Sequence, residues 1–164
     1  MKRVIIVRHA KAVPTDYDND IERGLTERGE DDAETISKEL KKSGISAELI
    51  ISSPAKRAKK TAEIFAKTLD YPKKSIRFEK KLYSGKSPEN FLIMLKELED
   101  ELNTVFVFGH NPSVYYYMNY LMRDFTYDVP TCSTIAIDFD IDSWSDLEAR
   151  SGELGLRLIP DMFR

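Results

Sequence analysis

The chain contains only two histidines, and each follows a short apolar run typical of a buried β-strand. His9 follows the run at 4–7, with Arg8 between them. His110 follows the run at 105–108, with one glycine between them. An imidazole is largely neutral near pH 7 and can act there as a nucleophile, and a guanidinium presents a planar fork of donors that matches phosphate oxygens. These residue types indicate chemistry on a phosphoryl group.

A third apolar run, at 49–51, leads to a second arginine. We interpret Ser53 and Pro54 as the N-cap and first residue of a helix, which places Arg57 in its first turn. Free backbone N–H groups and the helix dipole favour an anion at such a helix start. In open α/β sheets, ligands bind beyond the carboxyl ends of the strands. The residues that we expect to meet there around an anion are Arg8, His9, Arg57 and His110.

Each of these residues alone also has a structural interpretation. A histidine at a strand end is commonly a satisfied structural residue, and a lone Arg8 would commonly lie at the surface or in an ion pair. Four such side chains at three strand ends are much harder to explain in this way. The arginines supply positive charge, so neither a metal nor a cofactor is expected. Arginines crowding the same place also disfavour metal ligation by the two histidines.

Strands and helices alternate along the chain, which predicts an α/β fold: a three-layer α/β/α sandwich with a mostly parallel central sheet. The last two strands have no clear helix between them, so one of them is expected to be antiparallel. We find no internal repeat or linker and interpret residues 1–164 as a single domain. The expected strands are 4–7, 49–51, 76–78, 105–108, 134–139 and 154–159. One helix is expected over 26–43 with Gly44 as its stop, and others start at 53–54, 87–88 and 111–112.

Composition limits the possible partners. The 164 residues carry 25 Lys and Arg against 28 Asp and Glu, a net charge of −3, which gives no broad electrostatic field for nucleic acid. An anion site must therefore be a local cluster of arginines. The N-terminal apolar stretch is too short for a signal peptide and no run approaches a membrane span, so the expected compartment is the cytoplasm. Cys132 is the only cysteine and is interpreted as a buried structural thiol.

Four motifs, in order along the chain, resemble those of the histidine phosphatase superfamily, which includes phosphoglycerate mutase-like enzymes. Residues 7–10, Val-Arg-His-Ala, resemble its Arg-His-Gly signature, and residues 25–29, Leu-Thr-Glu-Arg-Gly, resemble its Leu-Thr-x-x-Gly turn. Residues 52–62 resemble its Ser-Ser-Pro-x-x-Arg-Ala-x-x-Thr-Ala segment, and residues 109–112, Gly-His-Asn-Pro, its second-histidine motif. The short chain and the Arg-His-Ala-Lys at 8–11 are most similar to SixA-type phosphohistidine phosphatases.

The resemblance implies a role for each site residue. His9 would be the nucleophile, phosphorylated during turnover. Arg8, Arg57 and His110 would hold the phosphoryl oxygens. Ala10 stands where the wider family has glycine, and its small side chain should be tolerated. The implied activity is hydrolysis of phosphohistidine on a partner protein, for example a histidine-containing phosphotransfer domain, without a metal or cofactor.

The general acid of many family members has no clear counterpart. By alignment, Lys81 falls where those members have a glutamate that protonates an alcohol leaving group. Glu79 lies two residues earlier and would share a strand face, so it stays open as an acid, although a solvent-facing charge is the favoured interpretation. Loss of general acid catalysis costs about 10²–10⁴-fold. A phosphohistidine loses less, because its imidazole can carry a proton on the other ring nitrogen.

Two alternatives stay open: a small-molecule phosphomonoesterase of the same fold, and a non-catalytic phosphate-binding module. The chain has little spare length for a lid over a small substrate, which favours an open groove and a phosphorylated protein. The oligomeric state and the partner are not fixed by the sequence.

Other residues near the expected site have simpler interpretations. The acidic loop after the first strand is interpreted as solvated; its members are Asp16, Asp18, Asp20 and Glu22. Arg23 is placed where it can reach the groove. One of the tyrosines at 115–117 is a candidate to line the groove and contact a substrate ring, and the others are expected to pack or to face water. Trp144 is interpreted as a packing residue.

Overall fold

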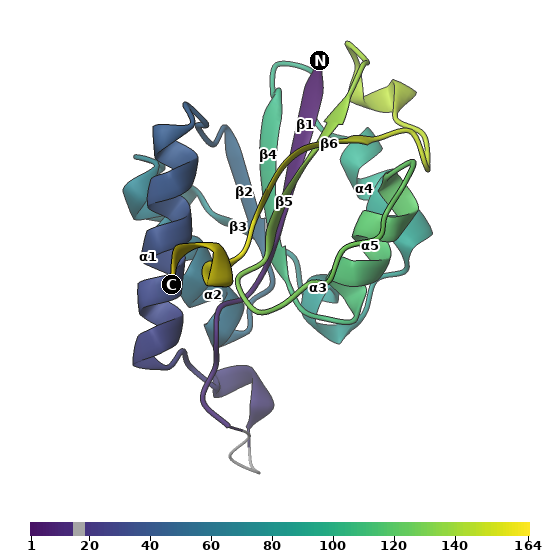
Figure 1. The fold of residues 1–164 in the computed structure, drawn as a ribbon. Helices are drawn as coiled ribbons and strands as arrows, with labels where there is room; N and C mark the ends of the chain where they lie inside the picture. The colour runs from purple at the N-terminus through teal and green to yellow at the C-terminus, as the bar shows by residue number, and fades with distance from the viewer. Residues whose placement is uncertain (15–18) are drawn as a thin grey trace.

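The structure is a computed structural model that describes residues 1–14 and 19–164 (Figure 1). Its strands are β1 (Lys2–Arg8), β2 (Leu49–Ser52), β3 (Arg77–Phe78), β4 (Thr104–Gly109), β5 (Thr134–Phe139) and β6 (Glu153–Leu158). Its α-helices are α1 (Glu27–Lys42), α2 (Lys56–Thr68), α3 (Lys81–Ser84), α4 (Pro88–Lys96) and α5 (Ser113–Leu121). Short 3₁₀ turns are η1 (Asp20–Glu22), η2 (Lys73–Ser75), η3 (Trp144–Asp146) and η4 (Pro160–Phe163).

The strands form one six-stranded sheet in the order β3-β2-β4-β1-β5-β6. Neighbouring strands from β3 to β1 pair in parallel, whereas β5 pairs antiparallel with both β1 and β6. This confirms the prediction of a mostly parallel sheet with one antiparallel strand among the last two. Because β1, β2, β3 and β4 run in the same direction, their carboxyl ends meet at one edge of the sheet.

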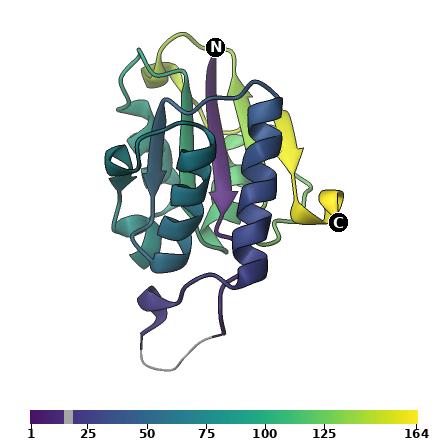
Figure 2. The same ribbon diagram turned by 90° about the vertical axis from the view of Figure 1, so that its left-hand side faces the viewer.

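Helices cover both faces of the sheet, as Figures 1 and 2 show. Successive residues of a strand point to opposite faces, and β1 illustrates the consequence. Ile5 and Val7 join the core beneath α1 and α2, whereas Val4 and Ile6 join the core beneath α4 and α5. All four are fully buried. The short β-branched run therefore fills two cores at once, and the predicted three-layer sandwich is confirmed.

Helix α1 begins and ends within one residue of its predicted limits. Thr26 caps its start, because the Thr26 side chain accepts a hydrogen bond from the backbone N–H of Gly29 at 3.0 Å. The backbone N–H of Thr26 donates to the carbonyl oxygen of Lys11 at 2.9 Å, which ties the segment after β1 to the helix. Gly44 follows the helix with a φ of 79°, a left-handed conformation that glycine adopts without strain.

The predicted start of helix α2 at Ser53 and Pro54 is wrong by two residues. The backbone N–H of Ser53 still donates to Phe108 of β4 at 3.0 Å, so this residue continues the sheet instead of capping the helix. Its hydroxyl accepts from the backbone of Ala55 at 3.2 Å, and the helix begins at Lys56. Arg57 nevertheless lies in the first turn, as expected.

Two residues interpreted as packing residues are fully buried. Trp144 has no exposed surface, and its indole N–H donates to the carbonyl oxygen of Leu102 at 2.8 Å. Cys132 is also fully buried and free of a disulfide. Within residues 1–14 and 19–164, no helix is both long enough and apolar enough to cross a membrane.

Candidate active site

The two histidines lie next to each other because their strands are neighbours in the sheet. Arg8 pairs with Gly109 at the ends of β1 and β4, so His9 and His110 leave the sheet side by side. The centroids of their rings are 5.2 Å apart. The backbone N–H of His9 donates to the carbonyl oxygen of Gly109 at 3.0 Å, which fixes the two strand ends to each other.

The imidazole of His9 is held in one orientation by the backbone of the next residue, Ala10. It is 8% exposed, and its Nδ1 lies 2.7 Å from the carbonyl oxygen of Ala10. A carbonyl oxygen only accepts, so Nδ1 carries the proton and Nε2 keeps its lone pair. Burial lowers the pKa of His9 to about 4, and the charges of Arg57 and Arg8 act in the same direction. His9 is therefore neutral at pH 7, with Nε2 able to act as a nucleophile.

His110 directly follows β4, which lies between β2 and β1 in the sheet. Its Nε2 is 2.8 Å from the hydroxyl oxygen of Ser53, which follows β2. The ring of Tyr83 meets it edge-on, with the centroids 5.7 Å apart. Burial lowers the pKa of His110 to about 3, and the nearby His9 and Arg57 add to this effect. His110 is also neutral at pH 7.

Arg57 is almost fully buried, and both of its terminal nitrogens contact Asp20 in η1. Nη1 donates to the backbone carbonyl oxygen of Asp20 at 2.8 Å, and Nη2 donates to its carboxylate at 3.0 Å. The same carboxylate accepts from the Tyr83 hydroxyl and from Arg23 Nε, each at 2.9 Å. Partial burial acts to raise the pKa of Asp20, but the hydrogen bonds from Tyr83 and Arg57 outweigh it and lower the pKa to about 2.

Arg8 reaches the other side of the site. Its Nη1 donates to the carbonyl oxygen of Val129 at 3.0 Å, in the loop before β5, and burial lowers the pKa of its guanidinium. Three buried nitrogens of the expected site have no partner among the described residues: Arg8 Nε, Arg57 Nε and His110 Nδ1. Buried polar atoms are nearly always paired, so this concentration of unused hydrogen-bonding capacity is typical of a ligand site. It suits a small oxyanion held by arginines.

Glu79 directly follows β3, and its backbone N–H donates to the carbonyl oxygen of Ser52 at 3.0 Å. Its carboxylate accepts from the backbone N–H of Lys81 at 3.3 Å, at the start of α3. Glu79 and Lys81 line a hollow toward α4, and none of the four expected site residues lines that hollow. Asp16 and Asp18 of the predicted acidic loop lie outside the described residues.

The three tyrosines at 115–117 do not contact the histidines. Tyr117 is buried and stacks on Phe91 with the ring centroids 4.0 Å apart. The Tyr117 hydroxyl donates to the backbone carbonyl oxygen of Lys86. Tyr115 and Tyr116 are exposed. The aromatic neighbour of His110 is instead Tyr83, which sequence reasoning missed. The strand-end rule applied to β3 would have indicated it, because Tyr83 follows that strand in α3.

Asp20 was also missed as a site residue. It was interpreted as part of a solvated loop, yet it contacts Arg57, which is 37 positions away in the chain. No local pattern signals such a pair. Within residues 1–14 and 19–164, no group of three or more His, Cys, Asp or Glu side chains is arranged to hold a metal ion.

Comparisons with known proteins agree with the fold and the motifs. Residues 4–82 match the sequence model of the histidine phosphatase superfamily, branch 1. The fold is similar to that of the protein histidine phosphatase SixA solved with tungstate, with a TM-score of 0.86 and 24% identity over 99% of each chain. It is also similar to an Agrobacterium tumefaciens protein assigned to the SixA phosphohistidine phosphatases, with a TM-score of 0.80 and 24% identity over 97% of this chain and 98% of that one.

A curated relative covers nearly the whole chain as well. An uncharacterized chloroplastic protein of Arabidopsis thaliana is 26% identical over 165 residues, which span 96% of this chain and 75% of that protein. Residues 4–82 thus match the histidine phosphatase superfamily, and the whole chain has a fold similar to that of SixA. The family match and the similarity of fold together support phosphatase activity.

Proposed function

We propose that the chain hydrolyses phosphohistidine on a partner protein, through a covalent phosphohistidine intermediate on His9. The observation that carries the proposal is the state of the His9 ring. The carbonyl oxygen of Ala10 fixes the proton on Nδ1, and burial among arginines keeps the ring neutral. A neutral imidazole with a free Nε2 is the form that attacks phosphorus.

The neighbouring side chains suit the remaining roles. Arg8 and Arg57 carry the positive charge needed to hold phosphoryl oxygens, and His110 lies 5.2 Å from the nucleophile, measured between the ring centroids. In the first step, the Nε2 lone pair forms the new P–N bond while the substrate P–N bond breaks, and its electron pair leaves with the substrate imidazole. In the second step, water attacks phosphorus, which releases inorganic phosphate and regenerates His9.

The carboxylates around the site support a nitrogen leaving group over an alcohol. An alcohol must receive a proton as it leaves, and this help is worth about 10²–10⁴-fold. Asp20 is held ionised by the hydrogen bonds from Tyr83 and Arg57, and Glu79 is engaged at the start of α3. A phosphohistidine protonated on its other ring nitrogen leaves as a neutral imidazole and needs no such donor. SixA, whose fold is similar, is named as a protein histidine phosphatase.

The test is a substrate panel with the purified chain: a phosphorylated histidine-containing phosphotransfer domain, a phosphoserine peptide and a sugar phosphate. We expect the phosphohistidine protein to be hydrolysed with by far the highest kcat/KM. Faster hydrolysis of the sugar phosphate would replace the proposal with the small-molecule phosphomonoesterase. If wild type and His9→Ala are equally inactive while both bind phosphate, the chain is a binding module.

The intermediate can be assigned because only two histidines are present. Rapid quenching with ³²P-labelled substrate should give an acid-labile, base-stable phosphoryl label on the wild-type chain. His9→Ala should abolish the label, whereas His110→Ala should slow its formation and leave it on His9. A label that survives in His9→Ala would exclude His9 as the nucleophile.

Three further expectations from the sequence are part of the same proposal. Residues 1–164 act as a single histidine phosphatase domain, the reaction proceeds without a metal or cofactor, and the protein acts in the cytoplasm. Activity that is unchanged after exhaustive treatment with a metal chelator would support the second of these.

A further inference from the structure

The small net charge of the chain conceals a strong separation of charge. Residues 56–86 hold 11 Lys and Arg against three Asp and Glu, a net charge of +8. The remaining residues hold 14 basic and 25 acidic side chains, a net charge of −11. The basic segment runs from α2 through η2 and β3 to α3, so it includes the β3 edge of the sheet and the helix that covers β2 and β4 beside it.

Five exposed lysines of this segment gather around two adjoining hollows, and we call them the basic face: Lys56, Lys59, Lys60, Lys73 and Lys74. One hollow has a volume of about 560 Å³ and the other about 390 Å³, and both are lined by Lys59, Glu63 and Lys73. Glu63 pairs with Lys73 at 3.6 Å. In the part of the chain that the structure describes, the other four lysines form no ion pair.

The basic face also contains an exposed aromatic ring. Phe78, on the edge strand β3, is 44% exposed and lines the larger hollow. The Lys59 ammonium lies 5.6 Å from the centroid of this ring. Lysines often protect the edge of a sheet from pairing with another chain. That explanation does not extend to Lys56, Lys59 and Lys60, because these residues belong to α2, which covers a face of the sheet.

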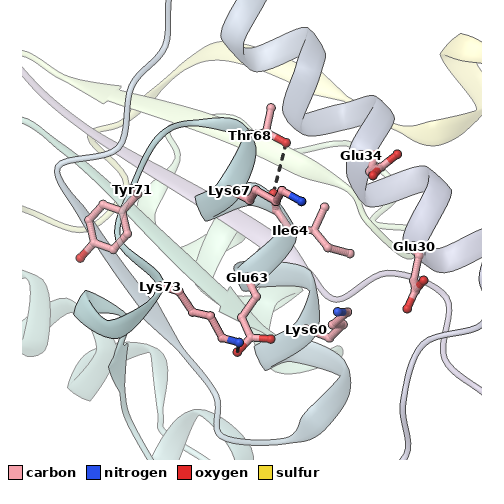
Figure 3. A pocket seen from close by; sticks show the side chains of 9 residues that line it. All are labelled: Glu30, Glu34, Lys60, Glu63, Ile64, Lys67, Thr68, Tyr71 and Lys73. Atoms are coloured by element: carbon pink, nitrogen blue, oxygen red, sulfur yellow. Dashed lines mark hydrogen bonds and ion pairs between the residues drawn. The ribbon is translucent and has the colours of Figure 1, made fainter.

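The basic face has a sharp border on one side and leads to the active site on the other. Figure 3 shows the border, where Lys60 and Lys67 of α2 face Glu30 and Glu34 of α1 across a hollow of about 480 Å³. On the other side, the smaller hollow is lined by Glu22 and Pro54. Glu22 belongs to η1, which carries Asp20, and Pro54 directly follows Ser53, so the smaller hollow adjoins the candidate active site.

We propose that the basic face docks an acidic patch on the phosphorylated protein substrate. The inference rests on the proposed function, and it adds the surface that selects the protein. An acidic patch of limited size matches five lysines beside the site. A long polyanion or a negatively charged membrane would also meet the rest of the chain, whose net charge is −11, and would be repelled. Charge complementarity therefore favours an acidic protein over nucleic acid or lipid.

The test compares two phosphohistidine proteins of opposite surface charge. We would measure kcat/KM for an acidic histidine-containing phosphotransfer domain and for a basic histone phosphorylated on histidine with phosphoramidate. The acidic domain should be preferred about tenfold or more at low salt, and this preference should fall steeply between about 50 and 300 mM NaCl. Hydrolysis of p-nitrophenyl phosphate should change little with salt. Preference for the histone would overturn the proposal.

Charge reversal identifies the surface. K59E/K74E should raise KM for the acidic domain about tenfold, and K59Q/K74Q should raise it about threefold. Both variants should hydrolyse p-nitrophenyl phosphate within about twofold of wild type, which shows that they fold. K38E/K96E carries the same charge change on exposed lysines of α1 and α4 and should keep the wild-type KM. Equal losses in K59E/K74E and K38E/K96E would overturn the proposal.

Binding measured without turnover separates this proposal from the proposed function. In a His9→Ala background, fluorescence anisotropy would report binding of the labelled acidic domain with and without K59E/K74E. Loss of binding in K59E/K74E supports docking even if wild type turns the domain over slowly. Tighter binding of a single-stranded RNA or of vesicles with 30% phosphatidylserine, lost in the same variant, would contradict the choice of a protein partner.

Discussion

Arg57 donates one terminal nitrogen to the backbone carbonyl oxygen of Asp20 and the other to its carboxylate, at 2.8 and 3.0 Å. A buried arginine needs partners, because an unpaired buried charge is costly. Asp20 supplies them from η1, and its carboxylate also accepts from Arg23, just after this turn, and from Tyr83 in α3. The negative charge of Asp20 orients Arg57 and also offsets part of the positive charge that a phosphate would meet.

Asp20→Asn should therefore strengthen inhibition by inorganic phosphate. The amide oxygen can still accept from Arg57 and Tyr83, and only the hydrogen bond from Arg23 is lost, so the contact with Arg57 is kept while one negative charge is removed. We expect the inhibition constant for phosphate to fall about five- to tenfold. The control is Asp161→Asn, which removes an exposed carboxylate that pairs with Arg164 at the C-terminus. An unchanged or weaker inhibition constant in Asp20→Asn would show that Asp20 does not offset the charge of Arg57.

Gly29→Ala should destabilise the fold and lower activity together. A Cβ at Gly29 would clash with the backbone carbonyl oxygen of Lys11, two residues after His9. Overpacking of this kind costs about 1–3 kcal/mol. We expect urea unfolding to show a loss of about 2 kcal/mol, with a fall in kcat because the segment after β1 must shift. Asp31→Ala, an exposed change in the same helix, should leave both quantities unchanged.

Cys132→Ser should leave the activity intact. The thiol is fully buried, and burial raises its pKa, so it is not a nucleophile at neutral pH. The contact of Cys132 with the site is made by its backbone N–H, which donates to the carbonyl oxygen of His9 at 3.0 Å and is kept in the variant. We expect kcat/KM within about twofold of wild type, and a native thiol that reacts with a disulfide reagent only after unfolding. A large loss in kcat/KM would give Cys132 a role that its position does not suggest.

Much of the fold was predictable because its strands are short, apolar and rich in β-branched residues. The run at 134–139 coincides with β5, and the run at 4–7 lies within β1. Helix α1 was predicted within one residue because Thr26 and Gly44 mark its ends locally. Helix α3 was not predicted, because a four-residue helix shows no periodicity.

The parts of the site that were not predicted depend on distant contacts. The start of α2 was placed at Ser53 and Pro54, whose local pattern is that of a cap. Pairing of Ser53 with Phe108 in the sheet overrides that pattern. Asp20 has the sequence context of a solvated acid, and only the folded chain brings Arg57 to it. Strand ends can be located from local sequence, whereas the partners of a loop carboxylate cannot.

The two buried histidines should make the fold sensitive to acid over a defined pH range. In the unfolded chain both imidazoles titrate near pH 6.5, whereas in the folded chain the pKa of His9 is about 4 and that of His110 is about 3. Between these values the unfolded chain binds more protons than the folded chain. The free energy of unfolding must therefore fall as the pH falls from 6.5 toward 4, by up to about 1.4 kcal/mol per pH unit for each histidine.

Asp20 affects the stability of the fold in a lower pH range, so its contribution can be measured separately from that of the histidines. Its pKa falls from 3.8 in the unfolded chain to about 2 in the folded chain, so its contribution to stability is lost only as the pH falls below about 4. Urea unfolding at pH 7, 6, 5 and 4.5 thus reports mainly the histidines. Unfolding of His9→Gln or of His110→Gln should take up about one proton fewer than unfolding of the wild type, because each variant lacks one imidazole that the unfolded chain protonates. The free energy of unfolding should therefore fall less steeply with falling pH in each variant. Slopes that match the wild-type slope in both variants would mean that these imidazoles are not held neutral by the fold.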